Sequence, residues 1–235
     1  MSANSFFMLD HRKESLLRYI IEDYIETAQP VGSKQLAERH GLDVSSATIR
    51  NEMASLEIEG FLRHPHTSAG RIPTEKAYLY YLQNLLQPRK PEVFQEEFPT
   101  QEFTLKTLAK RLVEVTGETA IIASGPEAIY AIGVSHLLQK PDFSEIEDLH
   151  SISALIDQFD EVMAGLYAQV KEETIVYIGS QNPFGADMTT ILVRYRMGDD
   201  HEGVLGLVGP LRMNYAKNIA LVERAKELIT QLYES

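Results

Sequence analysis

The chain has no cysteine among its 235 residues, which excludes disulfide bonds, zinc sites built on thiolates and cysteine nucleophiles. It also lacks any run of about eighteen uninterrupted apolar residues, the length that a membrane-spanning helix requires. Its first residues show no long apolar stretch followed by a small-residue cleavage site. These absences predict a soluble, cytoplasmic protein without membrane contact.

Positive charge is scarce and unevenly distributed. Residues 1–90 carry 11 Lys and Arg against 11 Asp and Glu, so the net charge of −12 comes from residues 91–235. An acidic surface repels a polyanion. Any contact with nucleic acid must therefore come from the first part of the chain, and from a local arrangement of side chains rather than from overall charge.

The first part of the chain has the pattern of three short helices, a hairpin and a fourth helix. Ser33 is the expected N-cap of the second helix, Ser45 or Ser46 that of the third, and Thr74 that of the fourth. The pattern of residues 61–73 predicts two short extended pieces around a turn with Ser68, Ala69 and Gly70 at its tip. This order is typical of a winged helix-turn-helix domain. The expected helices cover residues 9–27, 34–41, 46–60 and 75–86.

The second part predicts a small domain in which strands and helices alternate. A proline-rich segment over residues 88–103 serves as the linker, which gives domains over residues 1–87 and 104–235. We expect an α+β protein whose second domain holds an antiparallel sheet. Its strands are expected over 119–124, 174–179, 189–197 and 203–209, with the segment "IYAIG" at 129–133 left unassigned, and its helices over 104–117, 145–172 and 214–233.

The third helix of the first domain has two distinct faces. Ile49, Met53 and Leu56 form an apolar stripe, and the opposite side is small and polar around Asn51. In a winged helix-turn-helix this helix enters the major groove, where Arg is the usual partner of guanine and Asn of adenine. Free amides at the helix N-terminus suit a phosphate. The predicted DNA contacts of this helix are Ser45, Ser46, Thr48, Arg50 and Asn51.

The hairpin that follows is rich in arginine, histidine and hydroxyl side chains, which can lie along phosphates or enter the minor groove. Its predicted DNA contacts are Arg63, His66, Thr67, Ser68 and Arg71. Two alternatives remain open. The serines and the hairpin can serve only as a cap and a connection, and winged helices also act as protein–protein modules.

Other chemistry finds little support. His64 and His66 have a spacing that suits metal ligands, but no cysteine or suitably placed carboxylate accompanies them. The segment "GLVGPLR" lacks the Lys-Ser/Thr ending of a phosphate loop, and Pro210 removes an amide donor. No nucleophile, base and orienting group occur in a known motif. We expect no metal, no cofactor and no enzyme activity.

A family resemblance runs through "PVGSK", "VSSATIRNEM" and "PHTSAGRIPT" in the first domain and "VGPLRMNYAKNIALVE" near the end of the chain. These segments closely resemble the heat-inducible transcription repressor HrcA family. The resemblance implies a repressor of chaperone genes that binds double-stranded DNA at an inverted-repeat operator called CIRCE, acts as a homodimer and is released on heat stress. It also implies dependence on the GroE chaperonin and a GAF-like second domain carrying an inserted dimerisation domain.

The chain is shorter than is typical of that family. It passes from "TAIIASGP" almost directly to "AIYAIGVSHLLQKPDF", where the family places more sheet and the inserted domain. We therefore expect an N-terminal winged helix-turn-helix domain followed by a reduced GAF-like α/β domain, and the mode of dimerisation is open. The alternative function is a small-molecule-sensing winged-helix regulator of another regulon.

Overall fold

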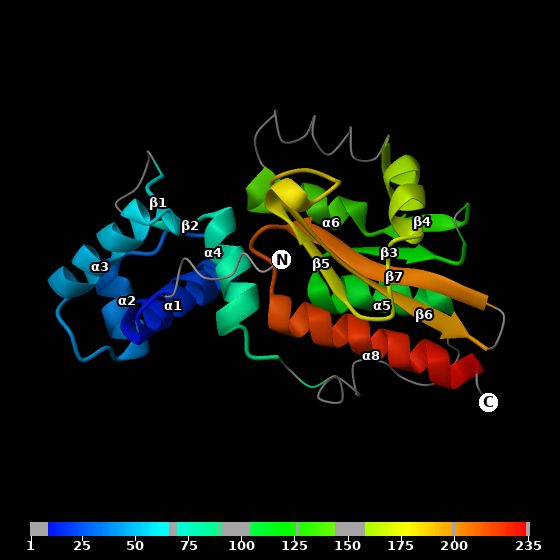
Figure 1. The fold of residues 1–235 in the computed structure, drawn as a ribbon, viewed down its shortest axis with the longest axis horizontal. Helices are drawn as coiled ribbons and strands as arrows, with labels where there is room; N and C mark the ends of the chain where they lie inside the picture. The colour runs from blue at the N-terminus through cyan, green and yellow to red at the C-terminus, as the bar shows by residue number, and fades with distance from the viewer. Residues whose placement is uncertain are drawn as a thin grey trace, which may run out of the picture. The chain divides into compact units, whose positions relative to one another are not determined.

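The computed structural model describes residues 9–65, 70–88, 90, 104–125, 127–143, 158–198 and 201–233. The chain forms two compact units, Met1–Leu86 and Gln87–Ser235, and each is described by itself (Figure 1). Helices and an antiparallel sheet together confirm the predicted α+β class. Among the described residues, no helix is long and apolar enough to cross a bilayer. Most of the expected linker, residues 89 and 91–103, lies outside the described residues.

The first unit follows the predicted order of elements. Three helices precede a two-stranded antiparallel sheet in which Leu62 pairs with Pro73 and Arg63 with Ile72. A fourth helix then continues into a π-helical turn. The bounds are α1 His11–Thr27, α2 Ser33–His40, α3 Ser46–Ile58, β1 Leu62–Arg63, β2 Ile72–Pro73, α4 Glu75–Tyr80 and the π-turn Tyr81–Leu85.

Helix caps in this unit come from short polar side chains, as predicted at two of three positions. Ser45 Oγ accepts from the Thr48 amide at 3.1 Å, and Thr74 Oγ1 accepts from the amide of Ala77 at 3.4 Å. The prediction for Ser33 is wrong. Gly32 is the N-cap, because its extended backbone places its carbonyl to accept the first helical bond from Leu36, and Ser33 is the first helical residue.

The core of the first unit is formed by the apolar stripes of α1, α2 and α3. Ile20, Leu36 and Ile49 are fully buried there. Asp23 of α1 is buried as well, and its Oδ1 lies 3.0 Å from His40 Nε2 and 3.3 Å from Arg39 Nε. These contacts join α1 to the end of α2, since Arg39 and His40 both belong to the last turn of that helix.

The second unit is built on a five-stranded antiparallel sheet in the order β4-β3-β7-β6-β5. The bounds are β3 Thr119–Ala123, β4 Ile129–Ile132, β5 Ile175–Ile178, β6 Met188–Met197, β7 His201–Pro210, α5 Leu105–Thr116, α6 Val134–Leu138, a 3-10 turn Pro141–Phe143 and α8 Tyr215–Tyr233, with a further helix over 158–167. The predicted strands are all present.

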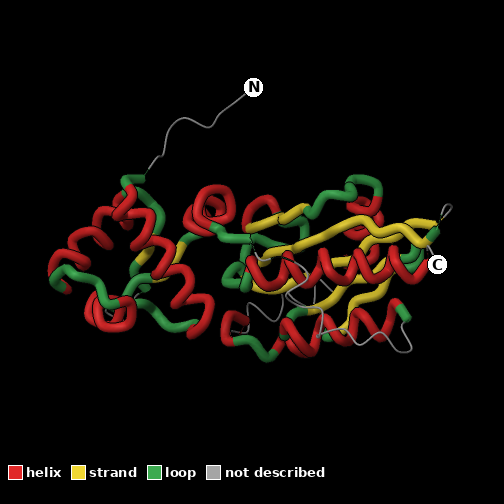
Figure 2. The backbone as a smooth tube through the Cα atoms, turned by 90° about the horizontal axis from the view of Figure 1, so that it is seen from below, coloured by secondary structure: helices red, strands yellow, loops and turns green. Residues whose placement is uncertain are grey.

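Helices pack on the sheet from both sides. α5 and α8 contact each other and the strands β3, β6 and β7, and α8 runs along the sheet in both views (Figures 1 and 2). The opposite face carries an apolar cluster, in which Leu137 of α6 and Phe159 and Met163 of the 158–167 helix pack with Ile121 and Val208. This clear two-sided burial explains why the central strands β3 and β7 are almost continuously apolar.

Two helix predictions in this unit need correction. α6 was not expected, because five residues after Gly133 are too few to show a helical period. The acidic helix expected over 145–172 lies partly outside the described residues, and its described part ends at residue 167. It ends early because Arg194 of β6 donates to the carbonyls of Tyr167 and Val170, the latter at 2.8 Å.

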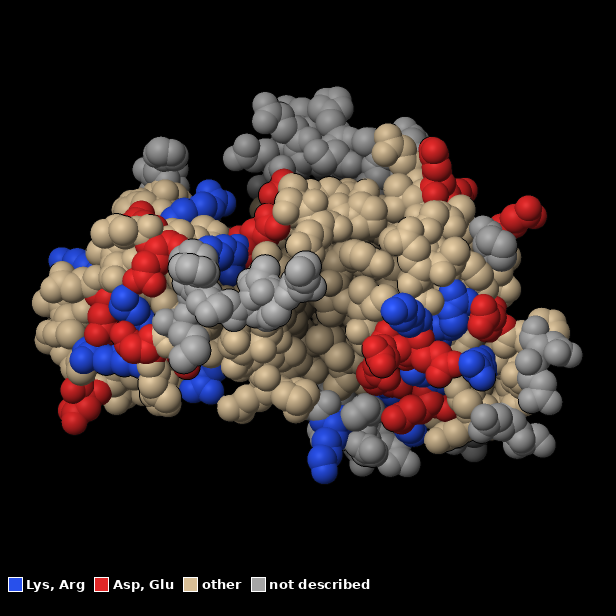
Figure 3. Space-filling view, viewed as in Figure 1, with Lys and Arg blue, Asp and Glu red and all other residues tan. Residues whose placement is uncertain are grey.

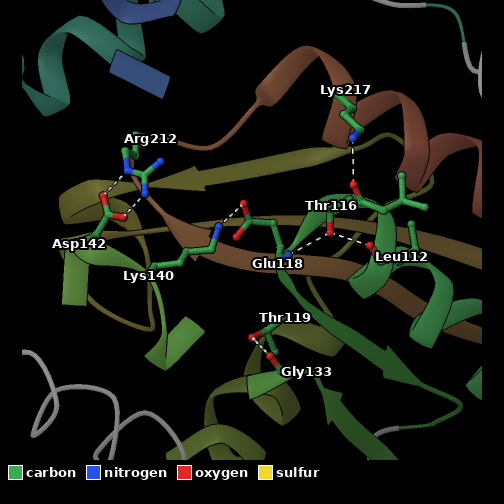
Figure 4. Close-up of polar contacts among 10 residues, drawn as sticks. Leu112, Thr116, Glu118, Thr119, Gly133, Lys140, Asp142, Arg212 and Lys217 are labelled. Carbon is green, nitrogen blue, oxygen red and sulfur yellow. Dashed lines mark hydrogen bonds and ion pairs between the residues drawn. The ribbon is translucent and has the colours of Figure 1, made fainter. Parts of the chain in front are cut away.

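A group of charged side chains lies at one end of the sheet (Figure 4). Lys140 Nζ lies 2.9 Å from Oε1 of buried Glu118, and Arg212 Nε donates to Asp142 Oδ1 at 2.7 Å. The Arg212 pair joins the turn after β7 to the 3-10 turn. Within "LRMNY", Met213 is buried, so this segment of the family resemblance has a structural role.

Candidate nucleic-acid interface

α3 is anchored by one face and exposed on the other. Ile49, Met53 and Leu56 are 0–4% exposed, which confirms the predicted apolar stripe. Arg50 and Asn51 are exposed on the outer side. Among the described residues, neither side chain has a hydrogen-bond or ion-pair partner. Two residues able to recognise base edges are thus presented by a helix whose position is set by its core contacts.

The start of α3 uses its hydroxyl groups within the helix. Ser45 Oγ accepts from the Thr48 amide and also lies 2.9 Å from Thr48 Oγ1. Ser46, the first helical residue, is half-buried. The cap leaves the amides of the first turn at the protein surface, where they can donate to an anion.

Every carboxylate of α3 and its C-cap is paired with a cation from another element. Arg12 Nε of α1 lies 2.7 Å from Glu52 Oε1, and Lys13 Nζ lies 2.5 Å from Glu59 Oε1. The hydrogen bond from Lys13 lowers the pKa of Glu59 below its ordinary range. The third pair joins Glu57 to Arg71.

These pairs explain how a unit with balanced charge can present a basic helix face. Acidic and basic side chains lie interspersed on the face of the first unit seen in Figure 3. Because the carboxylates of α3 are neutralised by cations, no unpaired negative charge on this helix opposes the charge of Arg50.

The hairpin contributes cations of two kinds. Arg63 on β1 is exposed, whereas Arg71 beside β2 has a side chain only 19% exposed and is bound to Glu57. His64 is exposed, with its Nδ1 lying 2.8 Å from the Pro65 carbonyl. The predicted contacts His66, Thr67 and Ser68 lie outside the described residues.

A groove of about 880 Å³ runs between the start of α2, the outer side of α3 and the hairpin. It brings Arg50 and Arg71 together with residues that the sequence did not single out as contacts. Those with polar or charged side chains are Ser33, Lys34, Gln35, Glu38 and His64. The available signal was the "GSKQ" segment, which places a lysine and free amides in the first turn of a helix.

Fold and site define an α+β protein of two units, with an exposed Arg/Asn helix face next to a hairpin in the first unit and helices packed on both faces of a sheet in the second. Residues 80–219 match the family model described as "HrcA protein C terminal domain". This match covers more than half of the chain, and the chain therefore belongs to the HrcA family.

Similar proteins support this assignment. A protein of Halalkalibacterium halodurans named "Heat-inducible transcription repressor HrcA" is 28% identical over 342 positions, which cover 97% of this chain and 99% of the relative. A protein of the same name from Desulforudis audaxviator is 46% identical over 116 residues, 49% of this chain and 33% of the relative. The 342 aligned positions exceed the 235 residues here, so the first relative has residues without a counterpart in this chain.

A solved crystal structure described as that of a hypothetical protein has the same fold. It superposes with a TM-score of 0.76 over 95% of this chain and 99% of its own, at 19% sequence identity. Family membership identifies the chain as a heat-shock transcription repressor and not an enzyme.

Proposed function

We propose that this repressor binds an inverted-repeat operator of the CIRCE type, as a homodimer, upstream of chaperone genes in the cytoplasm. In this proposal α1 to α3 and the β1–β2 hairpin form a winged helix-turn-helix, and α3 enters the major groove. The observation that carries it is the outer face of α3, where Arg50 and Asn51 are exposed without partners among the described residues and every carboxylate is neutralised.

Each residue of the interface has a proposed role. Arg50 and Asn51 contact base edges, and the first turn of α3, with Ser45, Ser46 and Thr48, faces a phosphate. Arg63 contacts the backbone or the minor groove, together with His66, Thr67 and Ser68 of the hairpin tip. Arg71 lines the groove at the base of the hairpin, where its side chain is paired with Glu57.

The second domain, proposed over residues 104–235 after a linker at 88–103, pairs two DNA-binding domains of residues 1–87. We assign it a reduced GAF-like fold, supported by its antiparallel sheet flanked by helices. Heat acts on this domain by loosening it, and GroE chaperonin restores the DNA-binding form. The family resemblance supports both steps.

Selection of bound DNA from a random pool tests operator recognition directly. The expected product is an inverted repeat, because two identical heads related by a two-fold axis contact half-sites of opposite orientation. Enrichment of a single half-site would contradict the homodimer. A lack of any enriched sequence would contradict specific DNA recognition.

Heat control has its own test. Operator affinity of purified protein is expected to fall on mild heating and to recover faster when chaperonin and ATP are added. Bovine serum albumin at equal concentration is the control for nonspecific protection. Affinity that is unchanged by heating and by chaperonin would remove this part of the proposal.

A second candidate function, effector sensing, is favoured by a cavity of about 210 Å³ in the second unit. Its floor is formed by Thr119 and Val208 of the sheet, and its walls by Leu137, Phe159 and Asp160. A cavity of about 150 Å³ suffices for a benzene-sized molecule. A thermal-shift screen with metabolites separates this function from control by heat alone, because only an effector raises the melting temperature with its concentration.

A further inference from the structure

The base of the hairpin is attached to the segment that precedes α2. The amide of Val31 donates to the carbonyl of Arg71 and the amide of Arg71 donates to the carbonyl of Val31, both at 2.9 Å. Next to this bridge, a Cβ built on Gly70 would lie 2.7 Å from the carbonyl carbon and oxygen of Pro30. The second strand therefore approaches the α1–α2 connection at backbone distance.

The Arg71 side chain attaches the same point to α3. Arg71 Nε donates to Glu57 Oε2 at 2.8 Å, and the two side chains are 19% and 32% exposed. A half-buried hydrogen-bonded ion pair defines a geometry better than an exposed one, because fewer water molecules compete for its atoms. Backbone and side chain of one residue thus connect the hairpin to the segment before α2 and to α3.

Glu57 occupies an unexpected place for an acidic residue. It lies seven residues after Arg50, which at 3.6 residues per turn puts the two within about 20° of each other around α3. A free carboxylate on this stripe would repel the phosphates of bound DNA. Its pairing with Arg71 offsets that repulsion, and the carboxylate holds the hairpin to α3.

We propose that Glu57 and Arg71 are positioning residues for operator binding, and that their ion pair sets the position of the hairpin relative to α3. Arg71 then acts through Glu57 and not by touching a phosphate. The inference rests on the proposed DNA-binding function of α3, and it assigns a required role to an acidic side chain at the edge of a DNA interface.

Charge and geometry predict opposite effects for one substitution. Glu57→Gln removes a negative charge near DNA, so electrostatics alone predicts tighter binding. Loss of the hairpin position predicts weaker binding. A second readout is salt dependence. If Arg71 itself touches a phosphate, Arg71→Gln lowers the slope of log K against log salt by about 1 relative to Glu57→Gln, whereas a positioning pair gives both variants the same slope.

The experiment measures operator affinity of the full chain at several salt concentrations for Glu57→Gln, Arg71→Gln and the double variant. We expect each single variant to weaken binding about tenfold with the same salt slope for both, and the double variant to lose no more than either one, because the pair acts as a unit. The charge-reversed double variant, Glu57→Arg with Arg71→Glu, is expected to recover much of the loss.

The matched control is Glu52→Gln, which removes the same charge from α3 but breaks a pair with Arg12 of α1 instead of the hairpin. It is expected to bind the operator as well as the parent or more tightly. Far-ultraviolet circular dichroism and melting temperature verify that every variant is folded at the temperature of the assay.

Two results would overturn the proposal. One is Glu57→Gln binding equal to or tighter than that of the parent. The other is a salt slope that is lower by about 1 for Arg71→Gln than for Glu57→Gln, which would identify Arg71 as a phosphate contact. Failure of the underlying function has a different signature, in which Arg50→Ala also leaves operator affinity unchanged.

Discussion

Nζ of Lys140 lies 2.9 Å from Oε1 of Glu118, a carboxylate that is buried at the start of β3. The space around Glu118 is tight, since a Cβ built on Gly209 would lie 2.1 Å from its Oε2. Burial raises the pKa of Glu118 above its ordinary 4.5, and this effect is larger than the opposing influence of Lys140 and Arg212. The folded protein therefore holds this proton more tightly than the unfolded chain.

A pH dependence of stability follows from this raised pKa. The stabilising contribution is complete below pH 4.5 and is lost as pH rises through the higher pKa of the folded state. Relative to Glu118→Gln, the free energy of unfolding of the parent is expected to decrease from pH 4.5 towards neutrality. Urea unfolding at a series of pH values measures the difference.

Glu127→Gln, on an exposed turn before β4, is the control for a general effect of removing one carboxylate. An increase of the parent's stability relative to Glu118→Gln over this pH range would mean that the ion pair with Lys140 outweighs burial.

Substitutions on the outer face of α3 test base recognition. Arg50→Ala and Asn51→Ala are each expected to cost about 1–3 kcal/mol of discrimination between operator and mismatched DNA, as bidentate base contacts do. Gel-shift titrations with both DNAs give the value. Lys106→Ala, an exposed lysine of α5 in the second unit, has the same charge change and is expected to leave discrimination intact.

The N-cap of α3 is a second test. Ser45→Ala removes the acceptor of the Thr48 amide and is expected to destabilise the protein by about 1 kcal/mol. Ser45→Asp keeps an acceptor and should retain most of the stability, whereas Ser46→Ala should cost little because Ser46 is not the cap. Equal losses for Ser45→Ala and Ser46→Ala in thermal unfolding would contradict this assignment of the cap.

Gly70 should not tolerate a side chain. Gly70→Ala forces a Cβ against the backbone of Pro30, so a loss of about 1–3 kcal/mol is expected from overpacking. Gly32→Ala is the comparison, because a Cβ there meets no atom within 4 Å and only the cap preference changes. Thermal unfolding of both variants measures the loss of stability. A smaller loss for Gly70→Ala than for Gly32→Ala would show that the hairpin moves away from Pro30 without cost.

The sequence was most informative where local rules act. Periodicity and breakers located α1 to α3 and four of the five strands of the second unit, and short polar residues marked the caps of α3 and α4. The predictions that failed depend on distant residues or on very short elements. The end of the 158–167 helix is set by Arg194 from β6, which no local pattern announces.

In the candidate interface, too, some features could be predicted from the local sequence and others only from the folded chain. The exposure of Arg50 and Asn51 followed from the helical period of Ile49, Met53 and Leu56, because opposite faces of one helix are fixed by its sequence. The environment of Arg71 could not be predicted from the sequence. Its partner Glu57 lies fourteen residues away on another element, so only the folded chain brings the two side chains together.

Because of the ion pairs of α3, operator binding is expected to depend also on residues of other elements that do not contact DNA. Lys13 lies on α1, yet it neutralises Glu59 at the end of α3. A substitution of Lys13 by a neutral residue would release a negative charge beside the helix proposed to face DNA. Variants outside the proposed contacts are therefore expected to weaken repression through a carboxylate that has lost its cation, and a genetic screen for derepressed mutants should recover residues of α1 as well as those of α3.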